Sequence, residues 1–509
     1  MTLPRCTPRS HRCTPNPQRG PSKPESVVER IKSLIHSGAL RTGQRIPSVR
    51  AMAHQMGLSA MTVLDAYGRL EDDGVIESRP RSGYYVRPRP ASSAHQTSAA
   101  PAGTRAQPLA TGPHRARVPP WAEVLANLTR QQDLLPLGTG VPSPQLLAMG
   151  PLARHTVRAL NGAPTARVAN SSLGLGSSGL GALREQLAIR MVDSGCQLDT
   201  DSILVTVGAT QALVASLRAV TAPGDAVAVE SPGYTGFYGA LEFLSLQALE
   251  IPSSSSHGLS VPALREALRG PAKLRAVLLC PTLSNPTGAT MPDSAKAELV
   301  AACASAGVPI IEDDTFGELS FSSRRARSAK SFDPDNVVYV GSLSKLLAPE
   351  YRVGWIAGGR WQRDIAMAHG AMVMAPPLPT QLGAASFLAG GGIRRHLRRI
   401  RRIHAENMAM FRCLVAEAFP SGTRTASPEG GHFLWVELPE LGDSLALANE
   451  AVAYGFFIAP GALFSAAGSH GRCLRLNTAV TDGERLRRAL TTLGMLAARQ
   501  LTAHAWSDP

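Results

Sequence analysis

A stretch rich in proline, alanine, serine, threonine and glycine divides this sequence into two parts of different character. Residues 87–119 lack the regular apolar spacing of helices and strands, which predicts a flexible linker. Toward the N-terminus, residues 1–90 carry 15 Lys and Arg against 7 Asp and Glu, whereas residues 120–505 alternate short β-type runs with helical segments. A chain of 509 residues is expected to form several domains, and the linker separates the two main ones.

Composition narrows the class of protein further. The net charge of +14 favours anionic partners such as nucleic acid or phosphate groups. The sequence has no run of about 18 apolar residues and no apolar N-terminal segment of the signal-peptide type, so no membrane partner is expected. The 7 cysteines form no C-x-x-C pair, which indicates reduced thiols and no metal site. We therefore expect a soluble, cytoplasmic protein.

The first 22 residues form a segment of their own. Residues 1–22 contain five prolines and four arginines with almost no aliphatic side chains, which predicts a disordered basic arm. Two interpretations are open for this arm. It could tether the protein to DNA without sequence preference, or it could be an inert tail, and the second is favoured because basic tails are common.

Residues 23–86 have the pattern of three short helices followed by a pair of strands. Gly38 is expected to end the first helix, whose amphipathic stripe is formed by Val27, Val28, Ile31, Leu34 and Ile35. Ser48 is placed to cap a second helix with Val49, Met52, Ala53 and Met56 inward. Gly57 makes a turn, and Ser59 caps a third helix with the core face Val63, Leu64, Tyr67 and Leu70, which Gly74 closes.

Two short strands, Val75–Ser78 and Tyr84–Val86, flank the tip Arg79–Gly83 and form a wing. This order predicts a winged helix-turn-helix, a fold that binds double-stranded DNA at a promoter or operator. The residues placed to contact DNA are Arg45, Arg50, Ser59, Ala60, Met61, Thr62 and the wing-tip Arg81. Each arginine taken alone is better explained as a solvated surface charge, but the whole set favours DNA binding.

The run PSVRAMAHQMGLSAMTVLDAYGRLEDDGVIESRPRSGYYV resembles the DNA-binding domain of the GntR family. The resemblance covers about residues 25–86. The family often has arginine directly after the serine that opens the recognition helix, and this chain has Ala60 there. One phosphate or base contact, and with it the DNA sequence of the site, is therefore left open.

The long C-terminal part predicts an α/β fold with a mainly parallel sheet. Its β-type runs are flanked by loops rich in Gly, Pro, Ser or Asp. The runs are Ile203–Val207, Ala226–Glu230, Ala276–Cys280, Pro309–Glu312 and Val337–Gly341.

Polar residues follow several of these runs in a way that suits a phosphate-bearing aldehyde cofactor. Lys345 could form a Schiff base, with Ser342 and Arg352 supplying a hydroxyl and a bidentate cation for the phosphate. The backbone N–H groups of Ala209 and Thr210 lie between a strand and a helix and could cradle the same phosphate. The remaining candidates are Asp313 for the pyridine nitrogen, Asn285 for the ring hydroxyl, Tyr234 for stacking and Arg475 for a substrate or effector carboxylate.

Each of these motifs is weak alone, but their order resembles the fold-type I, aspartate-aminotransferase-like family over about residues 130–500. The resemblance implies pyridoxal 5'-phosphate as cofactor, a smaller C-terminal subdomain, and the roles given above at the matched positions. Lys345 would be the catalytic Schiff-base lysine. The phosphate would be held by Ser342, Arg352 and Thr210.

Two departures from the family bear on activity. Phe316 stands where the family normally has a tyrosine that hydrogen-bonds the ring oxygen, and residues 161–180 contain no tyrosine to reach a partner's phosphate. We therefore predict that the cofactor binds but that transamination is slow, well below the usual range of about 1–1000 per second.

Six arginines gather in one probable helix, and two interpretations of them are open. They could form a second DNA-contacting surface, or they could be the exposed face of a helix that is commonly basic in this family, and the second is favoured. The cluster consists of Arg394, Arg395, Arg398, Arg399, Arg401 and Arg402.

A GntR-like domain joined by a linker to an aminotransferase-like domain is the arrangement of the MocR family of transcriptional regulators. The resemblance spans nearly the whole chain after residue 24 and implies a homodimer. The leading hypothesis is a regulator that senses pyridoxal phosphate, or its adduct with a small amino compound, as effector. The alternatives are an active aminotransferase with an accessory DNA-binding domain, and a nucleic-acid-binding protein without sequence preference. The target genes, the sign of regulation and the amino compound are left open.

Overall fold

The computed structural model describes residues 23–36, 40, 43–73, 75–79, 83–87, 112–131, 133–162, 177–322 and 324–505. The chain divides into two compact units between residues 95 and 96, and each unit is described by itself. The predicted arm 1–22, Gly38, Gly74, Arg81 and most of the predicted linker lie outside the described residues. None of the described helices is long and apolar enough to cross a membrane.

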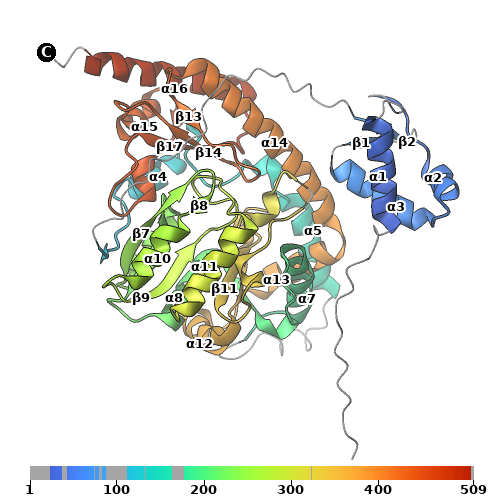
Figure 1. Ribbon diagram of the computed structural model, residues 1–509, viewed down its shortest axis with the longest axis horizontal. Coiled ribbons are helices and arrows are strands. Elements are labelled where there is room, and N and C mark those ends of the chain that lie inside the picture. Colours follow the sequence, from blue (N-terminus) through green and yellow to red (C-terminus); the bar gives the residue numbers. More distant parts are fainter. Residues whose placement is uncertain are drawn as a thin grey trace, which may run out of the picture. The chain divides into compact units, whose positions relative to one another are not determined.

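The N-terminal unit is a winged helix-turn-helix, as predicted (Figure 1). It consists of α1 (Lys23–His36), α2 (Val49–Met56), α3 (Ala60–Asp72), β1 (Ile76–Arg79) and β2 (Gly83–Val86). The two strands pair antiparallel, and Ile76 lies opposite Val86. Both predicted helix caps are confirmed, because Ser48 accepts from the Ala51 N–H and Ser59 from the Thr62 N–H. Gly57 takes the predicted left-handed conformation with φ +64°.

One core assignment in this unit was wrong. Val63, Tyr67 and Leu70 are buried as predicted, but the Leu64 side chain is 44% exposed. The buried stripe of α3 also includes Ala66, so it runs at the spacing i, i+3, i+4 and i+7 from Val63. Leu64 is one residue, or about 100°, away from that stripe. It therefore faces solvent.

The larger unit is built on a sheet whose order is β3-β7-β6-β9-β10-β11-β12-β5. Pairing is parallel from β7 to β11, whereas β12 runs antiparallel between β11 and β5. The predicted mainly parallel sheet is thereby confirmed, and each predicted run is a strand with ends within two residues. The strands are β3 (His114–Arg115), β5 (Ile203–Val207), β6 (Ala226–Ser231), β7 (Gln247–Ser254), β9 (Leu274–Leu279), β10 (Ile310–Asp313), β11 (Val337–Ser342) and β12 (Val353–Ala357).

Helices cover both faces of this sheet (Figure 1). Alternation along the strands sends Val227 and Val229 into one core and Ala228 into the other. One face packs on α8 (Gly208–Val220), α9 (Thr235–Phe243) and α12 (Gln362–Val373). The other packs on α5 (Met149–Gly162), α7 (Gly181–Met191), α10 (Val261–Arg269), α11 (Asp293–Ser305) and α13 (Leu378–Ala389).

A smaller C-terminal part has its own sheet and core, as the resemblance implied. Its sheet has the order β13-β14-β17-β16, and the long helix α14 (Gly392–Ala418) connects it with the larger sheet (Figure 1). Its apolar core includes Phe411, Leu434, Leu474 and Leu490. The elements are β13 (Arg424–Thr425), β14 (Phe433–Glu437), α15 (Ser444–Ala453), β16 (Ala459–Pro460), β17 (Cys473–Asn477) and α16 (Gly483–Ala505).

The two leucines of α3 give a matched test of this packing. Leu70 is fully buried and Leu64 is not, so the same change should have different effects. Leu70→Ala should lower the free energy of unfolding of the N-terminal unit by about 2–5 kcal/mol. Leu64→Ala should change it by less than about 0.5 kcal/mol. Urea unfolding followed by circular dichroism measures both, and equal losses would contradict the exposed position of Leu64.

Candidate functional site

The predicted cofactor residues lie at the carboxyl edge of the large sheet. β5 leads into Ala209 and Thr210, β10 ends at Asp313, and β11 ends at Ser342 just before Lys345. β12 pairs with both β5 and β11, so the loops that follow those two strands are neighbours. In open α/β sheets this edge is where ligands bind.

Lys345 is half-buried and carries an amine that loses its proton readily. Burial lowers the pKa of Lys345 to about 8, and the positive charges of Arg475 and Arg352 lower it further, while Asp313 opposes the shift. A lysine whose pKa lies near neutrality has a substantial fraction of neutral, nucleophilic amine. This is the form that attacks an aldehyde carbon.

Asp313 and Asp314 are neighbours in sequence but lie in different surroundings. Burial raises the pKa of Asp313 to about 6, although its carboxylate accepts from the N–H and the hydroxyl of Thr315 at 3.0 and 2.6 Å. Asp314 instead forms a buried ion pair with Arg325 at 2.6 Å and accepts from the Tyr339 hydroxyl. Asp314 is thus paired with a cation, although its Oδ1 has no partner among the described residues, whereas no described cation forms an ion pair with the buried Asp313.

The start of α8 and the Arg352 guanidinium lie next to each other. Gly208 has φ +76°, and a Cβ at this position would come within 2.4 Å of the Arg352 guanidinium. Arg352 is exposed and itself takes a left-handed conformation with φ +49°. Thr210 is exposed at the same helix start. Glycine is therefore required at position 208, where backbone N–H groups and a guanidinium converge.

Ser342 is buried in this edge, and its hydroxyl already has backbone partners. It donates to the Val353 carbonyl at 3.3 Å and accepts from the Ser344 N–H at 3.1 Å. The hydroxyl of Ser344 is buried and has no partner among the described residues. Ser344 thus carries a buried hydroxyl at this edge that is open to a ligand, and the sequence motif alone did not single it out.

Arg475 and Asn285 are brought together from distant parts of the chain. The Arg475 guanidinium donates to the Asn285 Oδ1 at 2.8 Å and to the Gly138 carbonyl at 2.7 Å. It lies between the rings of Phe433 and Phe464, 4.4 and 4.9 Å from their centroids, and burial lowers its pKa to about 9. The bond uses the amide oxygen of Asn285, so its NH2 group remains available as a donor.

Tyr234 precedes α9 and packs edge-on against Phe237 at 5.5 Å. Burial raises the pKa of its phenol, and the charge of Asp313 raises it further. Arg475 and Arg352 act in the opposite direction. Tyr234 is therefore close enough to the other candidate residues for their charges to affect its phenol. Its raised pKa keeps the ring neutral, which suits stacking on an aromatic cofactor.

His432 is a buried residue of this region that sequence reasoning missed. Its ring lies 5.5 Å from Phe316 and 4.5 Å from Phe433, and its Nδ1 has no partner in the described structure. Burial lowers its pKa well below the usual value, and the charge of Lys345 adds to this shift. The histidine follows a Gly-Gly pair, and no spacing rule pointed to it.

Glu230, a second residue that was missed, holds the loop before Asn285 in place. Its buried carboxyl accepts from the Cys280 N–H at 2.8 Å and the Ser284 hydroxyl at 3.2 Å. Burial raises its pKa to about 8. A buried acid with two donors from one loop fixes that loop, so Glu230 positions Asn285 without facing the site.

These features fit the cofactor that the sequence predicted. A nucleophilic lysine, a buried carboxylate and the Arg352 guanidinium lie at one edge. Ser344 Oγ and Arg475 Nε are buried polar atoms without partners in the described residues. Buried polar groups normally have hydrogen-bond partners, and a polar ligand bound here would supply the missing ones. Asp313 would face a ring nitrogen and Arg352 a phosphate.

The predicted DNA contacts lie on the surface of the N-terminal unit. Met61 is 73% exposed, and Thr62 shares a 2.8 Å hydrogen bond with Ser59 at the start of α3. Arg50 is exposed on α2. Arg45 lies against the wing, where a Cβ at Gly83 would come within 3.1 Å of its Nε. Arg81 lies outside the described residues.

The six arginines of α14 do not form one uniform face. Arg399 donates to the Gln145 carbonyl at 3.1 Å, and Arg401 donates to the Glu318 carbonyl at 2.7 Å. Arg394, Arg395 and Arg398 are exposed. Two of the six therefore hold α14 to its neighbours, and both interpretations of the cluster as a whole stay predictions.

Two family models match the chain. The model for aminotransferase class I and II matches residues 154–493, and the model for bacterial regulatory proteins of the gntR family matches residues 23–86. A gntR-type domain before an aminotransferase-like domain defines a class of transcriptional regulators. The chain belongs to the MocR-type members of that class, as its sequence predicted.

Individual proteins agree with this assignment. The uncharacterized HTH-type transcriptional regulator YjiR of Escherichia coli K12 is 34% identical over 92% of this chain and 98% of its own length. The HTH-type pyridoxine biosynthesis transcriptional regulator PdxR of Corynebacterium glutamicum is 28% identical over 76% of this chain and 78% of its own. A kynurenine aminotransferase from Pyrococcus horikoshii, crystallised with PMP, matches 75% of this chain and 94% of its own with 27% identity and a TM-score of 0.69.

The two adjacent aspartates should respond to the same substitution in opposite ways. In the cofactor-free protein at pH 7, Asp313→Asn removes a buried charge but keeps an acceptor for Thr315. It should raise the free energy of unfolding by about 1–3 kcal/mol. Asp314→Asn breaks a buried ion pair with Arg325 and should lower it by about 3–5 kcal/mol.

The pH dependence of the Asp313→Asn effect follows from its pKa. Asp313 has a pKa of about 6 in the folded chain and an ordinary value of 3.8. The folded state therefore binds the proton more tightly, so its charge costs stability as the pH rises through this window. Denaturant unfolding should show the advantage of Asp313→Asn in full above pH 6 and none near pH 4. An advantage that does not change with pH would contradict the buried charge.

Proposed function

We propose that this regulator binds pyridoxal 5'-phosphate covalently through Lys345 and that the bound cofactor, alone or with a small amino compound, is its effector. The observation that carries the proposal is the placement of Lys345 just after β11 and of the buried Asp313 at the end of the neighbouring strand β10, at the carboxyl edge of the sheet. When bound, pyridoxal phosphate supplies an aldehyde carbon and a protonated ring that withdraws electrons. Fold-type I relatives such as the kynurenine aminotransferase are solved with PMP.

Each candidate residue has one task in this proposal. Lys345 forms the covalent link, and Asp313 keeps the ring nitrogen protonated. Asn285 donates to the ring hydroxyl and Tyr234 stacks on the ring. The phosphate is held by Arg352, Ser342, Thr210 and the N–H of Ala209, and Arg475 pairs with the carboxylate of an amino compound.

The DNA part of the proposal is a homodimer that presents two winged helix-turn-helix domains to an operator. Effector control then requires that the cofactor binds one state of the dimer more tightly than another. The contacts proposed are those of Arg45, Arg50, Ser59, Met61 and Thr62, with Arg81 at the wing tip. A cytoplasmic location remains a prediction.

An active aminotransferase with an accessory DNA-binding domain is the second candidate. Its support is the match of aminotransferase class I and II over residues 154–493. Phe316 argues against fast turnover, because its ring, packed on His432 and Phe433, offers no hydroxyl to a cofactor oxygen. Efficient amino-group transfer without a preferred DNA site would favour this candidate.

Lysine replacement tests the covalent link directly. Pyridoxal phosphate added to the full chain should give a visible absorbance band, and borohydride should fix the cofactor on a peptide containing Lys345. Lys345→Ala should lose both signals, because Lys345 is the one lysine among the described residues proposed to hold the cofactor. The control is Lys273→Ala, an exposed lysine, which should keep both. An unchanged band in Lys345→Ala would contradict the proposal.

The exposed apolar pair on α3 predicts how bases are read. Met61 and Leu64 are 73% and 44% exposed at i and i+3 on the recognition helix. Apolar side chains in the major groove contact thymine methyl groups. On a site selected from random DNA, replacing thymine by uracil should weaken binding by about fivefold or more. That penalty should shrink in Met61→Ala, and equal binding of both DNAs would show that the pair reads no methyl group.

A further inference from the structure

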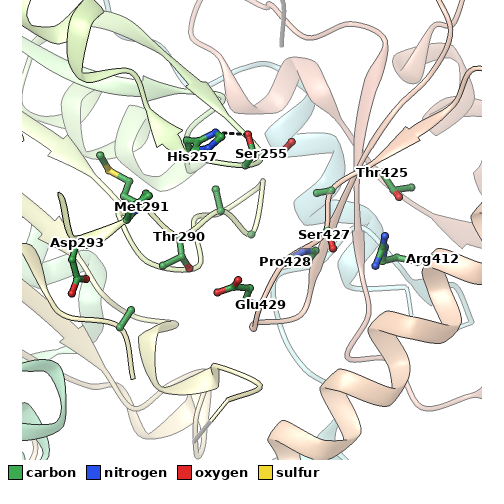
Figure 2. A pocket seen from close by; sticks show the side chains of 16 residues that line it. Ser255, His257, Thr290, Met291, Asp293, Arg412, Thr425, Ser427, Pro428 and Glu429 are labelled. Carbon is green, nitrogen blue, oxygen red and sulfur yellow. Dashed lines mark hydrogen bonds between the residues drawn. The ribbon is translucent and has the colours of Figure 1, made fainter. Parts of the chain in front are cut away.

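A cavity of about 570 Å³ lies between the larger sheet and the C-terminal part, away from the cofactor residues. Figure 2 shows His257, Met291 and Asp293 on one side, and Arg412, Thr425 and Ser427 on the other. This volume lies within the range of about 300–1,000 Å³ for small-molecule sites. None of the residues proposed to hold the cofactor lines it.

The charged groups of the cavity are not satisfied by one another. Arg412 on α14 and Glu429 are both exposed to solvent, and neither side chain forms a hydrogen bond or ion pair with any described residue, so both are open to a ligand. Asp293, the first residue of α11, adds a second carboxylate. The cavity therefore presents separated charges of both signs, with the hydroxyls of Thr425 and Ser427 near the guanidinium side.

We propose that this cavity binds a free amino acid, with its carboxylate on Arg412 and its ammonium group on Glu429. A simple anion would meet two uncompensated carboxylates, and a simple amine would leave the guanidinium unpaired. Arg412 and Glu429 both belong to the wall formed by the C-terminal part, so a zwitterion can pair with both at once, and Asp293 on the opposite wall is left for a second cation. Because the cavity has two carboxylates and one guanidinium, an amino acid with a second ammonium group, of the lysine type, is preferred.

Both walls of the cavity contain residues that are close in sequence to residues of the cofactor region. Gly288, which has φ +72°, follows Asn285 by three residues, and a Cβ on it would come within 2.6 Å of Pro428. Pro428 precedes Phe433, whose ring packs against the Arg475 guanidinium. An amino acid that bridges the two walls therefore fixes the contact between the loop of Asn285 and the strand of Phe433. The site is independent of the proposed function, since it needs neither cofactor nor DNA.

Equilibrium dialysis of the full chain with radiolabelled L-lysine tests the site. The chain is first loaded with pyridoxal phosphate and treated with borohydride. This adds hydride to the imine carbon and a proton to the nitrogen, so that the amine product no longer exchanges with amino acids. One L-lysine should bind per chain, more tightly than L-alanine. Acetate and propylamine should not compete at equal concentration.

Four variants identify where the amino acid binds. Arg412→Gln and Glu429→Gln should each weaken L-lysine binding about tenfold or more, the usual size of a lost charged hydrogen bond. Arg394→Gln, exposed on the same helix, is the matched control and should bind normally. Binding that is lost in Arg475→Gln and kept in Arg412→Gln would place the amino acid in the cofactor site and overturn the proposal.

The absence of saturable L-lysine binding would also overturn it. The visible absorbance of the same samples, read before reduction, reports separately whether Lys345 takes the cofactor. If that band is absent, the cofactor proposal has failed, and dialysis of the cofactor-free chain still decides the cavity. The two failures are therefore distinguishable.

Discussion

Charge buried at the carboxyl edge of the sheet is the constraint on which the rest of the site depends. Lys345, Asp313 and Arg475 lie close enough for their charges to act on one another, and burial is the largest cause of the pKa shift in each. A chain tolerates such groups only where a ligand or a partner completes them. The backbone also accommodates a charged group at this edge, because Gly208 has no Cβ and leaves room for the Arg352 guanidinium.

Contacts within the chain hold the residues of this edge in place. Glu230 holds the loop of Asn285, Asp314 is paired with Arg325, and the Arg475 guanidinium is shared between Asn285 and Gly138. These contacts already hold the loops around the site in one conformation. Cofactor binding therefore does not have to offset the entropy cost of ordering them.

The fold was predictable because its signals are local and repeated. Helix caps at Ser48 and Ser59, the turn at Gly57 and the alternating β-type runs each follow from the chemistry of a few neighbouring residues. Leu64 was misplaced because a leucine beside a core stripe looks apolar in sequence whichever way it faces. His432, Glu230 and Ser344 were missed because their importance comes from burial and from partners far away in the chain. The roles of the individual site residues remain predictions.

The central claim is that the cofactor controls DNA binding, and footprinting tests it most directly. DNA upstream of the chain's own gene and its divergent neighbour would be probed with the cofactor-free protein and again with pyridoxal phosphate. We expect a discrete protected site that shifts or strengthens when the cofactor is added. A discrete site that is indifferent to the cofactor would make an amino compound the signal and contradict control by pyridoxal phosphate alone. The absence of any discrete protected site would contradict the proposed regulatory function and favour an active aminotransferase.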